Sequence, residues 1–429
     1  MSGVASRHAA ADLLIKTLED RRTLDEAMAR SEVFDALTGA DRAFARAMAS
    51  ASLRHLGRID LALEPFLDRP LEEATPVVRA LLRVGAAQAW LLETPEHAVV
   101  GETVEAAKRW PEAQRAVGFL NAVLRKVVAT RDGFDATPIL NIWPDWLQQE
   151  LVDGVGEDAA AALAEAQLEQ PEIHLTPKSG DAAALAENVS GRIVGEGSVH
   201  VESTAIEQLP GFDEGEWWVQ DAAATLPALL LSVGPDDRVL DLCAAPGGKT
   251  MQLAATGAEV IAVDRSKPRL KRLKANLTRT GLQDVKLVAG DATSYRPDNP
   301  VSHILLDAPC SALGTLRRHP EGAWIKRRED VLRFPEIQLR LLKAALDMLP
   351  IGGTLVYCVC SPLPREGVDV VEAVVDDEAI ARASIRASDC PAFSHCITEK
   401  GDLLTLPALN QHDSFNHDAF YISRLTRQA

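Results

Sequence analysis

The sequence predicts an α/β protein in which a C-terminal domain with an open, mostly parallel sheet follows an all-α domain and a small α+β linker domain. From residue 218 onward, short apolar strands alternate with helices, which is the pattern of a parallel sheet with helical crossovers. Residues 4–130 instead contain Ala-rich amphipathic runs without an alternating β pattern. A chain of 429 residues is too long for one hydrophobic core, so we expect two or three domains.

The all-α domain, residues 1–134, is predicted to be a bundle of six or seven helices. Short breaks such as Thr38-Gly39 and Arg69-Pro70 separate its amphipathic runs. These runs are Ala9–Leu18, Arg42–Leu56, Val77–Leu91, Val99–Ala107 and Val117–Val128.

The linker domain, residues 135–215, differs in composition and charge. It begins with one acidic helix, Trp146–Leu168, and continues past Pro171 in short mixed elements. Residues 131–216 carry 3 Lys and Arg against 18 Asp and Glu. Most of the net charge of −17 therefore lies here, and it does not exclude a polyanionic partner for the rest of the chain.

A basic stretch, residues 265–343, holds 17 Lys and Arg against 8 Asp and Glu. A local positive field of this size suits a polyanionic substrate such as nucleic acid. The alternative is an ordinary solvated helix face.

The C-terminal domain, residues 216–429, is predicted to carry its site at the carboxyl ends of parallel strands. Four strands there are followed or closed by an aspartate, at Asp241, Asp264, Asp291 and Asp307. The predicted strands are Arg238–Leu242, Glu259–Val263, Val285–Ala289, Val301–Leu306 and Gly352–Val359, and the predicted helices are Thr250–Thr256 and Lys267–Thr280.

A glycine loop follows the first of these strands. Gly247 and Gly248 allow the backbone to approach a ligand at a helix N-terminus, although neither G-x-x-x-x-G-K nor G-x-G-x-x-G is present. Asp264 can accept both hydroxyls of a ribose, and Asp291 can face a purine edge. A single strand-end aspartate is often a helix N-cap, but this set after a glycine loop favours an adenosine cofactor.

Two cysteines follow strands of the same domain, in Asp307-Ala308-Pro309-Cys310-Ser311 and in Val359-Cys360-Ser361. A lone strand-end cysteine is usually a small buried hydrophobe, whereas two beside a cofactor loop indicate thiol chemistry. We expect Cys358 to serve only in packing. Cys358 and Cys360 lack a second pair or a histidine at zinc spacing, so no metal is expected.

The six cysteines lack the spacing of a small disulfide-rich domain and fit reduced thiols of the cytoplasm. The chain contains no run of eighteen apolar residues, and MSGVASRHAA lacks a signal-peptide core. We therefore expect a cytoplasmic protein without a membrane partner.

These motifs resemble those of the RNA 5-methylcytosine methyltransferases of the Sun/Nol1/Nop2 family, which use S-adenosylmethionine. Ala244 to Thr250 (AAPGGKT) matches the first motif of that family, DAPCS at Asp307 to Ser311 the fourth, and Cys360-Ser361 the core of the sixth. The N-terminal part resembles the NusB-like RNA-binding domain in Arg42-Ala43-Phe44, Leu81–Gly85, Pro95–Val100 and Asn121–Arg125.

The resemblance implies a Rossmann-like methyltransferase domain that forms 5-methylcytosine, with 16S small-subunit ribosomal RNA as the expected partner of a monomer. It implies that Cys360 attacks C6 of cytosine and that Cys310 assists release. Asp307 would hold the N3/N4 edge of the base, and Lys249 would support the base or the developing charge. The implied cofactor-binding residues are Cys243, Ala244, Ala245, Pro246, Gly247, Gly248, Lys249, Asp264, Asp291 and Asp307.

Three positions depart from the family pattern. Cys358-Val359 replaces Ser-Thr, Pro364-Arg365-Glu366-Gly367 stands where the family usually has a Glu-Asn pair, and Leu175-Thr176-Pro177-Lys178 replaces Leu-Arg-Val-Asn. Three alternatives stay open on sequence alone: the same chemistry on transfer RNA, a non-catalytic RNA-binding assembly factor, and a small-molecule methyltransferase.

Overall fold

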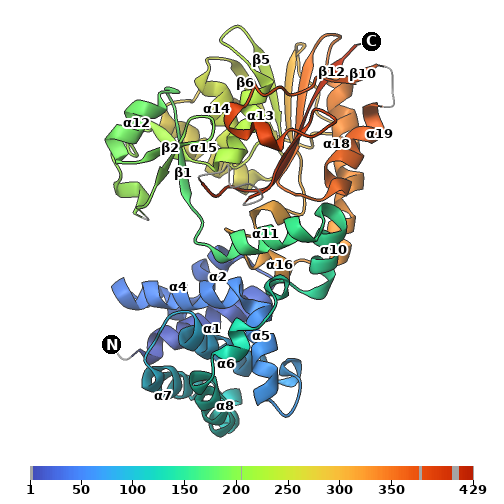
Figure 1. Cartoon of the computed structure of the whole chain (residues 1–429). Helices are drawn as coiled ribbons and strands as arrows, with labels where there is room; N and C mark the ends of the chain where they lie inside the picture. Colours follow the sequence, from blue (N-terminus) through green and yellow to red (C-terminus); the bar gives the residue numbers. More distant parts are fainter. Residues whose placement is uncertain (1–2, 204, 376–378, 408–414, 429) are drawn as a thin grey trace. The chain divides into compact units, whose positions relative to one another are not determined.

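The computed structural model describes residues 3–203, 205–375, 379–407 and 415–428 (Figure 1). By their internal contacts the residues form two compact units. One consists of residues up to Glu169 together with Leu316–Arg328, and the other of Gln170–Thr315 and the chain from Glu329 onward. The predicted linker domain is thus shared between both units, and its boundaries at residues 135 and 215 stay a prediction.

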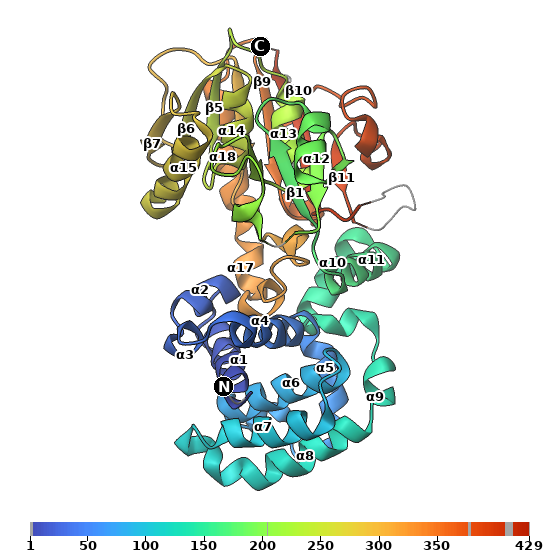
Figure 2. The same ribbon diagram turned by 90° about the vertical axis from the view of Figure 1, so that its left-hand side faces the viewer.

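The first unit is helical, as its amphipathic runs predict (Figure 2). Its central helix α6 buries eleven of its fifteen residues. Within residues 3–134, six helices have eight or more residues: α1 (Val4–Leu18), α4 (Gly39–Arg54), α5 (Leu56–Leu63), α6 (Pro76–Trp90), α7 (Glu96–Ala107) and α8 (Val117–Ala129). Shorter helices lie between or after them: α2 (Leu24–Ala29), α3 (Glu32–Asp35) and α9 (Asp132–Asp135).

The single acidic helix predicted over residues 146–168 is wrong. The structure has two helices there, α10 (Asp145–Val155) and α11 (Glu157–Leu168). Gly156 separates them with φ +87°, a left-handed conformation that an L-residue in a continuous helix does not adopt.

Leu316–Arg328, with the short helix α16 (Gly322–Ile325), belongs to the helical unit although it lies inside the sequence of the C-terminal domain. The Glu321 carboxylate accepts the Leu24 N–H at 3.2 Å. Arg21 Nε donates to the Ile325 carbonyl at 2.8 Å, and an Arg54 guanidinium nitrogen donates to the Arg317 carbonyl at 2.8 Å. This segment is therefore fixed by polar contacts to three different helical regions.

The second unit contains two sheets. The smaller is antiparallel, with strand order β2-β3-β1-β4. Its elements are β1 (Ile173–Pro177), α12 (Ala182–Val189), β2 (Arg192–Val194), β3 (Ser198–Val201) and β4 (Trp217–Val219).

Among the described residues the larger sheet has eight strands, with β11 paired to β12 and the others in the order β10-β12-β9-β8-β5-β6-β7. The five predicted strands are confirmed as parallel neighbours: β5 (Arg238–Leu242), β6 (Glu259–Asp264), β7 (Lys286–Ala289), β8 (His303–Asp307) and β9 (Thr354–Val359). Sequence analysis did not predict β10 (Ile380–Arg382), β11 (Leu403–Thr405) and β12 (Phe420–Arg427), which pair antiparallel.

Alternate residues of the parallel strands face opposite sides of this sheet. Leu240 and Leu306 pack with α18 (Phe334–Met348) and α19 (Val368–Val375). Val239 and Leu305 face the other way, toward α13 (Ala222–Leu231) and α14 (Gly248–Ala255). The remaining helices are α15 (Lys267–Thr280) and α17 (Arg328–Leu332). Helices on both faces leave the carboxyl strand ends as the place for a site (Figure 2).

Candidate active site

Four predicted site residues meet at the carboxyl edge of the parallel sheet. The Lys249 ammonium, in the first turn of α14, lies 2.9 Å from Oδ2 of Asp307 at the end of β8. The sulfur atoms of Cys310 and Cys360, which follow β8 and β9, are 3.4 Å apart. Residues far apart in sequence thus form one cluster of a cation, a carboxylate and two thiols.

The glycine loop after β5 is fixed by its backbone. Gly247 has φ +109°, and a Cβ built there would collide with the side chain of Leu273 in α15. The Asp264 carboxylate accepts the N–H of Ala245 at 3.2 Å and that of Ser266 at 2.8 Å. Conformation and packing therefore require glycine at this position, in addition to any approach by a ligand.

A hollow beside this loop combines polar and apolar side chains, the mixture that a small organic ligand needs. Its lining includes the carboxylates of Asp264 and Asp291 and the apolar residues Ile337 and Leu341 of α18. Its lining consists of Cys243, Val263, Asp264, Arg265, Arg269, Gly290, Asp291, Ala292, Thr293, Pro309, Ile337, Arg340 and Leu341.

Of the predicted cofactor residues, Cys243, Asp264 and Asp291 line this hollow. Ala244 to Lys249 and Asp307 lie outside its lining. The α18 residues carry no recognisable motif, so sequence reasoning missed them.

Charge interactions hold Lys249 protonated. Burial would lower the pKa of its ammonium group, but the Asp307 carboxylate beside it outweighs burial and raises the pKa above its ordinary value. The ammonium nitrogen also lies 5.0 Å from the ring centroid of Phe420 in β12. Lys249 is therefore a fixed cation and hydrogen-bond donor, and it is not a base.

Cys358 is more than the packing residue that the sequence predicts. It is fully buried, as expected, but its Sγ lies 3.4 Å from Oδ1 of Asp307. Burial, followed by the Asp307 charge, raises the pKa of this thiol well above its ordinary value, so it donates to the carboxylate. The β8–β9 register, which pairs Asp307 with Cys358, places these two residues side by side.

The thiols of Cys310 and Cys243 hold their protons as well. The hydrogen bond with Cys360, together with burial, raises the pKa of Cys310 well above its ordinary value. Burial and the nearby carboxylates raise the pKa of Cys243 to about 12. Cys310 thus enters the site as a thiol that shares a hydrogen bond with Cys360.

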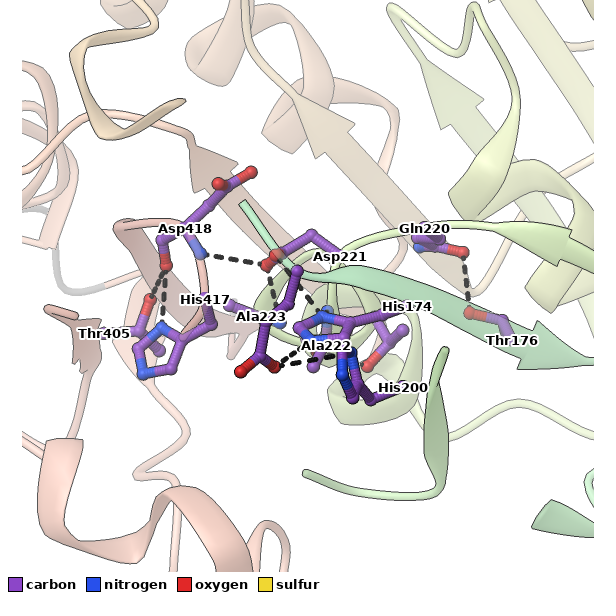
Figure 3. Close-up of polar contacts among 12 residues, drawn as sticks. His174, Thr176, His200, Gln220, Asp221, Ala222, Ala223, Thr405, His417 and Asp418 are labelled. Atoms are coloured by element: carbon purple, nitrogen blue, oxygen red, sulfur yellow. Dashed lines mark hydrogen bonds and ion pairs between the residues drawn. The ribbon is translucent and has the colours of Figure 1, made fainter. Parts of the chain in front are cut away.

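A second polar cluster lies at β1 and β3 of the small sheet (Figure 3). Within the part of the chain that the structure describes, Glu172, His174 and His200 each bring one possible ligand atom within 4.8 Å of the others. However, His174 Nδ1 accepts the Ala222 N–H at 3.1 Å, and its Nε2 lies 3.1 Å from the Glu172 carboxylate. Both ring nitrogens are therefore used in hydrogen bonds of the protein, and this geometry is that of a structural network.

Thr176, at one of the positions that depart from the family pattern, is also built into the structure. Its hydroxyl is 3.5 Å from Oε1 of Gln220 (Figure 3). The Gln220 amide donates to the Gln252 side chain of α14 at 2.6 Å. Lys178 Nζ donates to the Thr280 carbonyl at 3.0 Å. Thr176 and Lys178 therefore connect the small sheet to the two helices that follow the glycine loop, α14 and α15.

The doubly covered parallel sheet, the glycine loop, the hollow beside it and the paired thiols define a methyltransferase that uses S-adenosylmethionine. Residues 228–426 match the family model described as 16S rRNA methyltransferase RsmB/F, and residues 4–129 match that of the NusB family.

The chain is 35% identical over 401 residues to ribosomal RNA small subunit methyltransferase B of Xanthomonas campestris, covering 89% of this chain and 90% of that protein. The Pseudomonas putida protein of the same name is 34% identical and covers 99% of this chain and 98% of its own. The chain belongs to the family of ribosomal RNA small subunit methyltransferase B.

The solved structure of the protein PH0851 has the same fold, with a TM-score of 0.77 at 20% identity, covering 98% of this chain and 99% of that one. Across the described residues, no helix is both long and apolar enough to cross a membrane.

Proposed function

We propose that this chain forms 5-methylcytosine in 16S ribosomal RNA through a covalent adduct between Cys360 and C6 of the cytosine. The observation that carries the proposal is the pair of thiols 3.4 Å apart next to the Lys249–Asp307 ion pair. The names of the relatives, which are ribosomal RNA small subunit methyltransferases, support this substrate.

The chemistry explains why a thiol is needed. C5 of cytosine is a weak nucleophile, but addition of the Cys360 thiolate to C6 turns the ring into an enamine that attacks through C5. S-adenosylmethionine supplies the methyl group as an electrophilic sulfonium. Transfer of the C5 proton to a water molecule then gives its C–H electron pair to the C5–C6 double bond, breaks the C6–S bond and returns Cys360 as a thiolate.

The remaining residues orient the reactants. Asp264 and Asp291 would hold the ribose and purine of the cofactor, with Ile337 and Leu341 against the ring. Asp307, held by Lys249, would receive the N3/N4 edge of a cytosine turned out of its stack. Cys310 keeps its proton while Cys360 attacks. Cys310 then assists the elimination that releases the product.

The basic stretch and the NusB-like helices would bind flanking RNA through phosphates, so affinity should fall as salt rises. We also propose that the protein acts as a monomer in the cytoplasm and without a metal. The reason for proposing a reducing compartment is the cysteine spacing in the sequence, which lacks the pattern of a small disulfide-rich domain.

Bisulfite sequencing of RNA from a strain that lacks the gene tests the proposal. We expect one 16S cytosine to lose its methyl mark and to regain it when the gene is restored. Loss of a mark in transfer RNA with an unchanged 16S pattern would favour the transfer RNA alternative. A chain that does not bind S-adenosylmethionine in a titration would instead be a non-catalytic assembly factor.

A further inference from the structure

The carboxylate of Glu366 is buried behind both thiol loops. Its side chain is fully inaccessible to solvent. Oε2 accepts the Ser311 backbone N–H at 2.8 Å and the Gln338 amide at 3.0 Å. Oε1 accepts the Ser361 hydroxyl at 2.7 Å and also that of Ser311. These donors are neutral groups from three separate segments of the chain.

The two serines make this carboxylate relevant to the reaction. Ser311 directly follows Cys310, and Ser361 directly follows Cys360. Their hydroxyl oxygens lie 3.1 Å apart and converge on the same carboxylate oxygen. Glu366 therefore ties the two loops together one residue away from each sulfur atom.

The backbone and the partners of Glu366 are held as well. The Tyr357 hydroxyl, from β9, donates to the Glu366 carbonyl at 2.5 Å. Gln338 of α18 also donates to the Pro309 carbonyl at 3.0 Å, immediately before Cys310. A buried carboxylate held by neutral donors is costly, and its cost is lowered only when each hydrogen bond is made.

We propose that Glu366 is the positioning residue that holds the Cys310 and Cys360 loops at the separation both thiols need to act on one cytosine. This role rests on the proposed function, because it supplies the geometry for attack and release. Glu366 acts through the loops, since its buried carboxylate does not reach the substrate.

The direct test measures thiol proximity without catalysis. Dibromobimane joins two neighbouring thiols, and mass spectrometry identifies a Cys310–Cys360 bridge in the full chain. We expect Glu366→Ala to slow this bridging about tenfold and single-turnover methylation about 100-fold, as a displacement of about 1 Å can do. Glu366→Gln keeps the volume and two acceptor lone pairs, so it should restore part of both rates.

Two controls separate positioning from general damage. Exposed Glu399→Ala should change neither rate, and the dissociation constant for S-adenosylmethionine should stay within about twofold in every variant. If Glu366→Ala does not fold, Ser361→Ala removes one donor and should slow bridging in the same direction.

Unchanged bridging in the folded variants would overturn the positioning role. Normal bridging in the wild-type chain without any RNA methylation would instead overturn the proposed function and leave the role of Glu366 in loop geometry intact.

Discussion

The cofactor side and the thiol side of the site lie at one sheet edge but are built differently. On the cofactor side, one contiguous loop, Cys243 to Gly248, lies beside the hollow, and its shape depends on backbone conformation and the Asp264 carboxylate. The thiol side joins two loops fifty residues apart through the carboxylate of Glu366. A contiguous motif therefore sets the shape of the loop beside the hollow, whereas tertiary hydrogen bonds specify the alignment of the thiols.

The largest effect should come from Cys360→Ala, which removes the nucleophile on the thiol side. We expect methyl transfer to 16S RNA to fall by at least about 1,000-fold, because C5 alone cannot attack the methyl group. Cofactor affinity should not change. Radiolabelled methyl incorporation and calorimetric titration measure these two quantities, and a near-normal rate would reverse the assignment of the thiols.

Cys310→Ala, also on the thiol side, should separate the attack of Cys360 on the base from the release of the product. Turnover should fall strongly while a covalent RNA–protein adduct accumulates and survives denaturing electrophoresis. The double variant Cys310→Ala with Cys360→Ala is the matched control and should form no adduct. Absence of an adduct in the single variant would show that Cys310 does not act in release.

Asp264→Asn should affect the cofactor side alone. The carboxylate accepts two backbone N–H groups, and loss of such charge-assisted bonds costs about 1.5–3 kcal/mol, so cofactor affinity should fall about 10-fold to 100-fold. Bridging of Cys310 and Cys360 should keep its rate. Asp298→Asn, at an exposed carboxylate, is the control. Slower bridging in Asp264→Asn would mean that the two sides are coupled.

The last prediction concerns stability and has the smallest expected effect on activity. Burial raises the pKa of Asp241 from 3.8 to about 7, against the hydrogen bond from Thr250. Between these pH values the folded chain retains a proton that the unfolded chain loses, so this residue lowers stability as pH rises. Asp241→Asn removes that dependence.

The melting temperature of Asp241→Asn relative to the wild-type chain should therefore increase between about pH 5 and pH 7 and then level off. The corresponding difference in unfolding free energy is on the order of a few kcal/mol. Thermal denaturation at several pH values measures it. A constant difference across this range would contradict a buried, protonated Asp241.

The sequence predicted what local patterns encode. Five parallel strands and the helix Lys267–Thr280 follow from apolar runs and their capping residues, and the strand-end carboxylates follow from that order. The antiparallel strands β10, β11 and β12 were missed because their pairing is non-local. The break at Gly156 was missed because glycine inside a helical pattern is often tolerated.

In the site, too, local motifs could be predicted from the sequence and tertiary contacts could not. Motifs placed Lys249, Asp307, Cys310 and Cys360 together, as the structure finds. The contact of Cys358 with Asp307 depends on the register of two neighbouring strands. That register could have been inferred by aligning the two strand ends. Glu366 lies in the stretch where the family usually has a Glu-Asn pair, but this resemblance does not reveal its partners, which come from three separate segments.

Leu316–Arg328 has a practical consequence for dissecting this protein. The segment begins six residues after Cys310 in sequence, yet its contacts are with the helical unit, where Glu321 is almost fully covered and accepts the Leu24 N–H. A truncation that starts at residue 170 keeps this segment and discards the surface on which it folds. No single cut in the chain therefore yields an intact second unit. If the two parts are expressed separately, the helical fragment must bind Leu316–Arg328, which the other fragment carries.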